Sequence, residues 1–193
     1  MTLNKKNIQL LVVTFLITFV LAVISIIYFA PRLIMRGAQF KLTNSETVTS
    51  EGIAPLNSIS HTHRFPTAED RVIVRLNTDT FYSSGWFQLK DEPFVVHVPE
   101  TDGRYYSLQF NDVWTNAFAY IGKRTTGSEE GSYIIVGPKW EGDLPDGVKV
   151  ITSPSNLIWV IGRTMFLGAD DVEKVIAIQE QITFTPLSTY SIK

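Results

Sequence analysis

The strongest constraint in this sequence is an uncharged apolar run of 22 residues near the N-terminus, from Ile8 to Phe29. A helix of that length extends about 33 Å, which is enough to cross a hydrocarbon core of about 30 Å. The run has no polar face, as a helix packed on the surface of a soluble domain would have. We therefore predict a transmembrane helix over residues 8–30, preceded by a short basic N-terminus at 1–7.

A cleavable signal peptide is the alternative interpretation of this run. Such a peptide has an apolar core of about 7–15 residues and small residues at the cleavage site. The run here is longer, and Pro31 follows Ala30, the one suitable small residue. Lysines and arginines flank both ends, so the positive-inside rule hardly selects an orientation. Because long domains translocate largely regardless of charge, we expect the N-terminus inside and the domain outside.

The charge and the cysteine content of the remaining chain exclude several classes of protein. Four of the 17 basic residues lie in residues 1–36, so 13 remain against all 19 acidic residues, a formal charge of −6. A nucleic-acid-binding domain usually has a basic face, so we expect no nucleic-acid partner. The chain has no cysteine, which excludes disulfides, thiol nucleophiles and cysteine-ligated zinc.

The rest of the sequence predicts a mainly β domain. Residues 31–60 form a polar tether, residues 61–187 the domain, and residues 188–193 a tail. Short runs rich in valine, isoleucine and aromatic residues are separated by turn residues, which is typical of an antiparallel β-sandwich or jelly-roll-like fold. The predicted strands are Val72–Leu76, Phe81–Leu89, Phe94–Val98, Tyr105–Phe110, Ala117–Ile121, Tyr133–Val136, Val148–Ile151 and Leu157–Ile161. One C-terminal helix, capped by Asp170 or Asp171, is predicted to end before Thr185.

Ordered blocks of residues recur through residues 61–187. They are NTDTFYSSGW from Asn77, VPETDGRYY from Val98, DVWTN from Asp112, GKRTTG from Gly122, VGPKW from Val136, SPSN from Ser153 and WVIGR from Trp159, with Asp170-Asp171-Val172, Gln179 and Thr185-Pro186-Leu187. In these blocks the chain resembles the domain-of-unknown-function family 1254. The resemblance implies a β-rich, often exported bacterial protein, whose relatives usually carry a second domain of the unknown-function family 1214. It implies no catalytic residues.

A dense polar and aromatic block provides the candidate ligand-binding residues. Aromatic faces could contact a sugar or an apolar ligand while amide, carboxylate and guanidinium groups fix its orientation. A buried structural network is the alternative, since asparagine and aspartate are also common in turns. The candidates are Asn77, Asp79, Tyr82, Trp86, Arg104, Tyr106, Trp114, Asn116, Lys123 and Arg124.

The sequence gives little sign of catalysis or of a metal. His61 and His63 are two residues apart, so both would point the same way in a strand, but two ligands do not make a site. We therefore predict no metal and no cofactor, with these two histidines as weak metal candidates. The chain lacks the GxSxG motif of a serine hydrolase. GKRTTG departs from the GxxxxGK[ST] pattern of a phosphate-binding loop.

The leading functional hypothesis is a non-catalytic module in the bacterial inner membrane, with its domain on the extracytoplasmic side. The resemblance implies that it docks a separately encoded partner carrying a 1214-type domain. A carbohydrate or small-ligand binding protein is the alternative, and a metal-dependent hydrolase is the third hypothesis.

Overall fold

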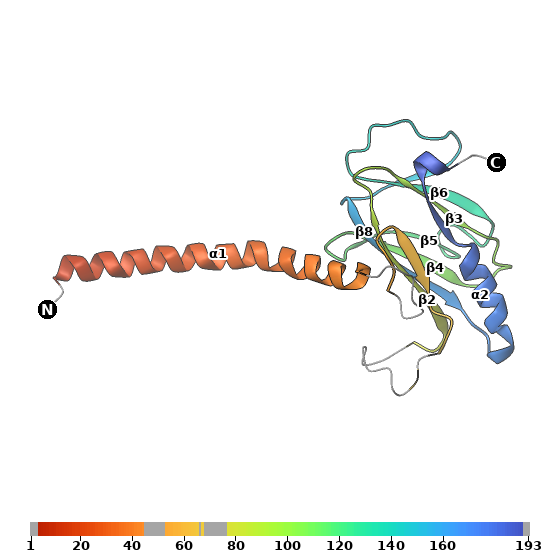
Figure 1. The fold of residues 1–193 in the computed structure, drawn as a ribbon, viewed down its shortest axis with the longest axis horizontal. Helices are drawn as coiled ribbons and strands as arrows, with labels where there is room; N and C mark the ends of the chain where they lie inside the picture. The colour runs from red at the N-terminus through yellow and green to blue at the C-terminus, as the bar shows by residue number, and fades with distance from the viewer. Residues whose placement is uncertain (1–3, 45–52, 66, 68–76, 191–193) are drawn as a thin grey trace. The chain divides into compact units, whose positions relative to one another are not determined.

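The computed structural model describes residues 4–44, 53–65, 67 and 77–190 (Figure 1). The chain divides into two units, Met1–Lys41 and Leu42–Lys193. The first contains all but the last two residues of α1 (Lys5–Thr43), a helix of 39 residues in which no residue is buried. Residues 8–29 lie inside it, and it is long and apolar enough to cross a membrane.

The helix α1 continues well beyond the predicted boundary at residue 30. It contains Pro31 and ends at Thr43, so the first part of the predicted tether is helical. The boundary at residue 30 was placed by hydropathy, whereas helix formation also depends on intrinsic propensity. Leu33, Met35 and Ala38 are favourable helix formers, which carry the helix past the end of the apolar run.

The second unit is built from two β-sheets that pack face to face (Figure 1). Sheet A has the strand order β1-β2-β8-β4-β5, and sheet B has the order β7-β6-β3-β9. The strands of sheet A are β1 (Ser58–His61), β2 (Thr80–Gln88), β8 (Leu157–Met165), β4 (Tyr106–Asn111) and β5 (Ala117–Gly122). Those of sheet B are β7 (Lys149–Thr152), β6 (Gly131–Val136), β3 (Phe94–Val98) and β9 (Thr183–Pro186).

The main hydrophobic core lies between the two sheets. Sheet A contributes alternate residues of its strands, such as Phe87, Phe110 and Val160, each with no exposed surface. Sheet B contributes Val96 and Ile135 from the facing layer. Because side chains alternate across a strand, residues between these inward positions point away from sheet B. We call the side of sheet A that points away from sheet B its outer face.

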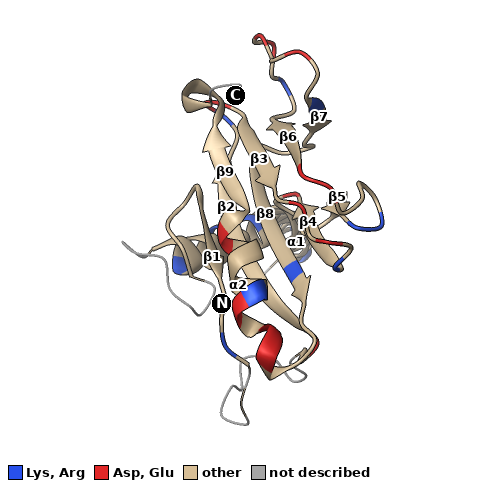
Figure 2. Ribbon diagram, turned by 90° about the vertical axis from the view of Figure 1, so that its right-hand side faces the viewer, with Lys and Arg blue, Asp and Glu red and all other residues tan. Residues whose placement is uncertain are grey.

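The corresponding outer side of sheet B is covered by the chain itself. Val95, Ile134 and Val136 form a second buried cluster there. The segment after β6 contributes Trp140, Leu144 and Val148, and the C-terminal 3₁₀ turn η2 (Leu187–Thr189) and Tyr190 complete the cover. Figure 2 shows acidic residues, in red, on the loop between β6 and β7 and on the C-terminal helix.

The mainly β fold with one C-terminal helix is confirmed, and seven predicted strands correspond to β2–β8. The eighth, Val72–Leu76, lies outside the described residues. The strands β1 and β9 were not predicted, because SISH has a single large apolar residue and TFTP contains a proline. The sheets are also not wholly antiparallel as predicted, since β7 pairs with β6 in parallel. The intervening residues 137–148 cross back over sheet B, which makes a parallel return possible.

The C-terminal helix α2 (Val172–Gln181) follows a 3₁₀ turn, η1 (Ala169–Asp171). Asp171 is its N-cap residue as predicted, but its carboxylate makes no hydrogen bond to the helix. Both of its oxygens instead accept hydrogen bonds from the Arg104 guanidinium, at 2.5 and 2.7 Å. Arg104 also donates to the Met165 carbonyl at 2.8 Å, so this one side chain joins the start of β4 to the end of β8 and to α2.

Replacing Arg104 by glutamine should lower the free energy of unfolding by about 3 kcal/mol. The substitution removes the cation that is paired with the Asp171 carboxylate, which is largely shielded from solvent. The two side chains are only 12% and 13% exposed. Urea unfolding of the detergent-solubilised chain, followed by tryptophan fluorescence, measures the change, since all four tryptophans lie beyond residue 80. Lys139→Gln at an exposed position is the control and should change stability by less than about 0.5 kcal/mol. Equal stability of the two variants would contradict the role given to the pair.

Candidate functional site

Strand register defines the residues of the outer face of sheet A. Directly paired residues in adjacent strands share a face, so three rows run across the sheet. One row contains Tyr82, Arg163 and Ser107; the next contains Ser60, Ser84, Ile161, Gln109 and Tyr120; the third contains Ser58, Trp86, Trp159 and Asn111. None of these residues is acidic, although the chain beyond residue 36 has a formal charge of −6.

A stacked tryptophan pair dominates one end of this face. Trp86 and Trp159 are paired in register, and their ring centroids are 5.5 Å apart with an angle of 6° between the planes. Trp86 is buried and Trp159 is half-buried, so Trp159 presents the accessible surface. The Trp159 indole N–H donates to the Ser84 hydroxyl at 3.1 Å. This hydrogen bond and the stacking hold the rings in one orientation before any ligand arrives.

Amide side chains and a rigid turn extend the tryptophan end. Gln109 donates to Asn111 at 2.7 Å, and Asn111 donates to the Trp159 carbonyl at 3.1 Å. The turn after Asn111 presents Trp114, which is 44% exposed. Asp112 fixes this turn by accepting hydrogen bonds from the Trp114 and Asn116 backbones and from the Asn116 side chain. Burial acts to raise the pKa of Asp112, but these hydrogen bonds outweigh it and lower the pKa.

Two arginine–tyrosine pairs mark the other end of the face. The Arg163 guanidinium lies 5.4 Å from the centroid of the Tyr82 ring, and Arg124 lies 5.5 Å from that of Tyr105. Among the described residues, neither guanidinium has a carboxylate partner. A guanidinium stacked on a ring keeps its N–H groups free for an anion. This end of the face therefore offers positive charge and aromatic surface together.

The candidate residues chosen from the sequence fall into three groups. Tyr82, Trp86 and Arg124 belong to the outer face or its edge, and Trp114 and Asn116 lie in the adjoining turn. The other five make contacts within the fold. Asn77 donates a hydrogen bond to Thr80 and accepts one from the Asp79 backbone N–H. Arg104 pairs with Asp171, and Lys123 donates to the Gly103 carbonyl. Tyr106 lies in the core, where burial raises its pKa.

Sequence reasoning missed Ser107, Tyr120, Trp159 and Arg163 as candidate site residues. A usable signal was present in the strand LIWVIGRTM, in which Trp159, Ile161 and Arg163 alternate with the inward-facing Ile158 and Val160. The relation of this strand to Tyr82 was not accessible, because the β2–β8 pairing joins segments about 75 residues apart.

The two histidines lie away from the outer face, beside the core side of β2. His61 Nδ1 is 2.8 Å from the Ser83 hydroxyl, which also accepts a hydrogen bond from Gln179 at 3.2 Å. Ser83 and Gln179 are buried, so this cluster joins β1 and β2 to α2 rather than facing a substrate. The His61 and His63 rings are parallel with centroids 6.3 Å apart. The described residues contain no group of three or more side chains suited to hold a metal.

Comparison with known proteins identifies the family. A family model described as "Protein of unknown function (DUF1254)" matches residues 56–186. The chain belongs to the DUF1254 family. The crystal structure of the VPA0106 protein from Vibrio parahaemolyticus is similar, with 32% identity and a TM-score of 0.57. The match covers 60% of this chain and 29% of the Vibrio protein, less than a third of its length.

An uncharacterized protein from Burkholderia cenocepacia matches with 12% identity and a TM-score of 0.44, over 70% of this chain and 36% of its own. No curated protein matches the chain. The DUF1254 assignment confirms the predicted resemblance.

Acid should destabilise the domain through His61 before it affects the carboxylates. Burial, with the neighbouring His63, lowers the pKa of His61 from 6.5 to about 4. As the pH falls below 6.5, the unfolded chain therefore binds a proton at His61 that the folded domain does not bind until about pH 4. The free energy of unfolding should fall by at most about 3 kcal/mol between pH 6.5 and pH 4. Asp171, whose pKa is lowered chiefly by the hydrogen bond from Arg104, loses its contribution only at lower pH.

Urea unfolding at a series of pH values measures this dependence. The His61→Gln variant lacks the titrating group, so its stability should change less between pH 6.5 and pH 4, whatever its stability at neutral pH. Parallel profiles for the variant and the original chain would show that another group causes the loss.

Proposed function

We propose that this DUF1254 protein is a membrane-anchored, non-catalytic module that docks a partner protein through the tryptophan end of the outer face of sheet A. The observation that carries the proposal is the stacked pair of Trp86 and Trp159, held in register on a sheet face. Large aromatic side chains that are fixed in advance are typical centres of binding energy in protein interfaces. The outer side of sheet B is covered by residues of the chain itself.

The helix α1 supports the anchoring part of the proposal. Its large apolar side chains are exposed on all sides, including Phe15, Ile24 and Ile27 at 65%, 57% and 70%. Such a surface is stable in lipid and costly in water, where each buried methylene is worth about 0.8 kcal/mol. The module is proposed to reside in the bacterial inner membrane with its domain on the extracytoplasmic side.

The partner is proposed to be a separately encoded protein with a 1214-type domain. The chain covers only 29% of the Vibrio protein that it resembles, so that relative contains much additional sequence. Two anchored proteins in one bilayer have a raised effective concentration, as two domains on one chain do. Among the described residues, the outer face has no acidic side chain and includes Arg163, so the partner surface should be acidic where it meets that row.

Binding of a carbohydrate is the second candidate function. The same tryptophan pair favours it, because a flat aromatic surface with amide groups beside it is suited to a sugar ring. A metal-dependent hydrolase has less support, since His61 and Ser83 face the core between β2 and α2.

Co-expression with the gene that encodes a 1214-type domain tests the docking proposal. The two detergent-solubilised proteins should co-purify, and Trp159→Ala should weaken their complex by at least about thirtyfold, as expected for a central aromatic anchor. Val150→Ala is the control, because Val150 is an apolar, solvent-accessible residue that lies on β7 of sheet B. The control should bind normally.

Two outcomes would count against docking through this face. One is that the two proteins elute separately when co-expressed. The other is a complex that tolerates Trp159→Ala as well as Val150→Ala, which would place the interface elsewhere.

A further inference from the structure

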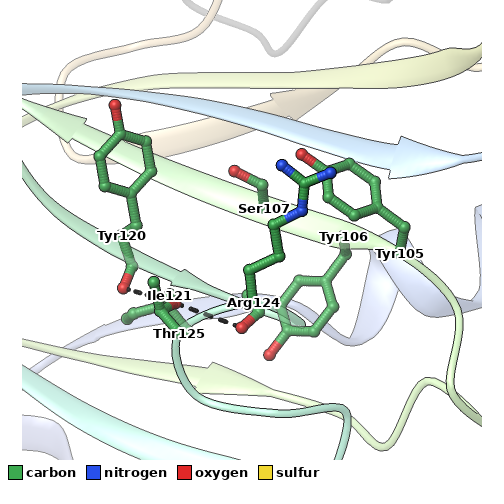
Figure 3. A pocket seen from close by; sticks show the side chains of 8 residues that line it. Tyr105, Tyr106, Ser107, Tyr120, Ile121, Arg124 and Thr125 are labelled. Carbon is green, nitrogen blue, oxygen red and sulfur yellow. Dashed lines mark hydrogen bonds between the residues drawn. The ribbon is translucent and has the colours of Figure 1, made fainter.

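A pocket of about 200 Å³ lies at the edge of sheet A, at the end where β4 begins and β5 ends (Figure 3). This is the arginine–tyrosine end of the outer face, away from the turn that carries Trp114. Its lining includes Tyr105, Tyr106, Ser107, Tyr120, Arg124 and Thr125. Three tyrosines, two hydroxyl residues and one arginine therefore surround a single small space.

A hydrogen-bonded turn directly after β5 places Arg124 beside this space. Thr125 donates to the Tyr120 carbonyl at 3.0 Å, and its backbone N–H donates to Gly122 at 2.9 Å. The Thr126 hydroxyl accepts from the Gly122 N–H at 3.0 Å and closes the turn from the other side. With the turn fixed at both ends, the pocket is formed before a ligand binds, which reduces the entropy cost of binding.

The electrostatics of the pocket select for an anion. Arg124 stacks on Tyr105 and has no carboxylate partner among the described residues. Ser107, which lines the pocket, is paired in register with Arg163 on the neighbouring strand β8. A second arginine therefore lies one strand away from the pocket. Figure 3 shows the Arg124 guanidinium beside the Ser107 hydroxyl and the Tyr105 ring. A carboxylate there would accept charge-assisted hydrogen bonds from Arg124.

The size and the lining of the pocket narrow the class of anion. Sites for drug-sized ligands measure about 300–1,000 Å³, so this one suits a ligand with a single ring. Tyr120 is 46% exposed and lies on the side of the pocket opposite Tyr105 (Figure 3). The hydroxyls of Tyr105, Tyr120 and Ser107 can exchange hydrogen bonds with ligand hydroxyls. A carboxylate, a ring with an apolar face and several hydroxyls together describe an acidic monosaccharide.

We propose that this pocket binds a sugar acid of the uronic acid class. Arg124 binds the carboxylate, Tyr120 packs on the ring, and Ser107 bonds a ring hydroxyl. This binding activity does not rest on the docking function, because that interface is centred on Trp159 at the other end of the face. Either activity can exist without the other.

Titration of the detergent-solubilised full chain with glucuronate, followed by isothermal calorimetry, tests the proposal. Saturable binding is expected, with a dissociation constant on the order of 1 mM, as for one ring in a small open pocket. Glucose, which lacks the carboxylate, should bind at least about tenfold more weakly. Inorganic phosphate and benzoate, which lack the hydroxylated ring, should likewise bind at least about tenfold more weakly than glucuronate.

Two variants test the assigned contacts. Arg124→Gln, at an exposed turn position, should weaken glucuronate binding at least about tenfold, because the charged hydrogen bonds are lost. Tyr120→Ala should also weaken it, through loss of ring contact. Lys139→Gln, at an exposed cation in the segment after β6, is the matched control and should bind as the original chain does. Urea unfolding confirms that each variant is folded.

Three results would overturn the proposal. They are the absence of saturable glucuronate binding, equal affinity for glucose, phosphate or benzoate, and unchanged affinity in folded Arg124→Gln. Equal affinity for phosphate would indicate an unselective anion patch. None of these results depends on whether Trp159 contacts a partner.

Discussion

The packing of sheet A on sheet B is the interaction on which the rest of this domain depends. Burying Ile158 and Val160 against sheet B commits Trp159 and Ile161 to the opposite side of the same strand. The same alternation on β2 places Trp86 outward when Phe87 is buried. The core thus determines which side chains the outer face presents, and a shift of register by one residue would exchange the two sets.

Two hydrogen-bonded turns then make the two ends of this face chemically different. At one end, the turn that Asp112 holds extends a surface of stacked tryptophans. At the other, the turn that Thr126 closes brings Arg124 beside Tyr105. The first suits a large partner surface and the second a small anion. Both proposals describe binding by side chains already in place, which agrees with a module whose contribution is attachment and recognition.

Much of the fold could be predicted from the sequence, because its signals are local. Apolar alternation and turn residues located β2 to β8, and the apolar run located α1. The end of α1 at Thr43 and the short strand β1 escaped prediction, because propensity and edge pairing decide them rather than hydropathy. The site was harder, since it depends on pairings between distant segments. Arg104 illustrates this: its partner Asp171 is 67 residues away, and only the fold shows that it stabilises α2.

The central claim is that a partner protein covers the tryptophan end of the outer face of sheet A. Site-specific photo-crosslinking tests it most directly, with a benzophenone amino acid placed at Ile161 on that face or at Val150 on sheet B. With the co-expressed 1214-type protein, we expect a crosslinked heterodimer from position 161 and little from position 150. A crosslink from position 150 alone, or equal crosslinking from both positions, would contradict the account.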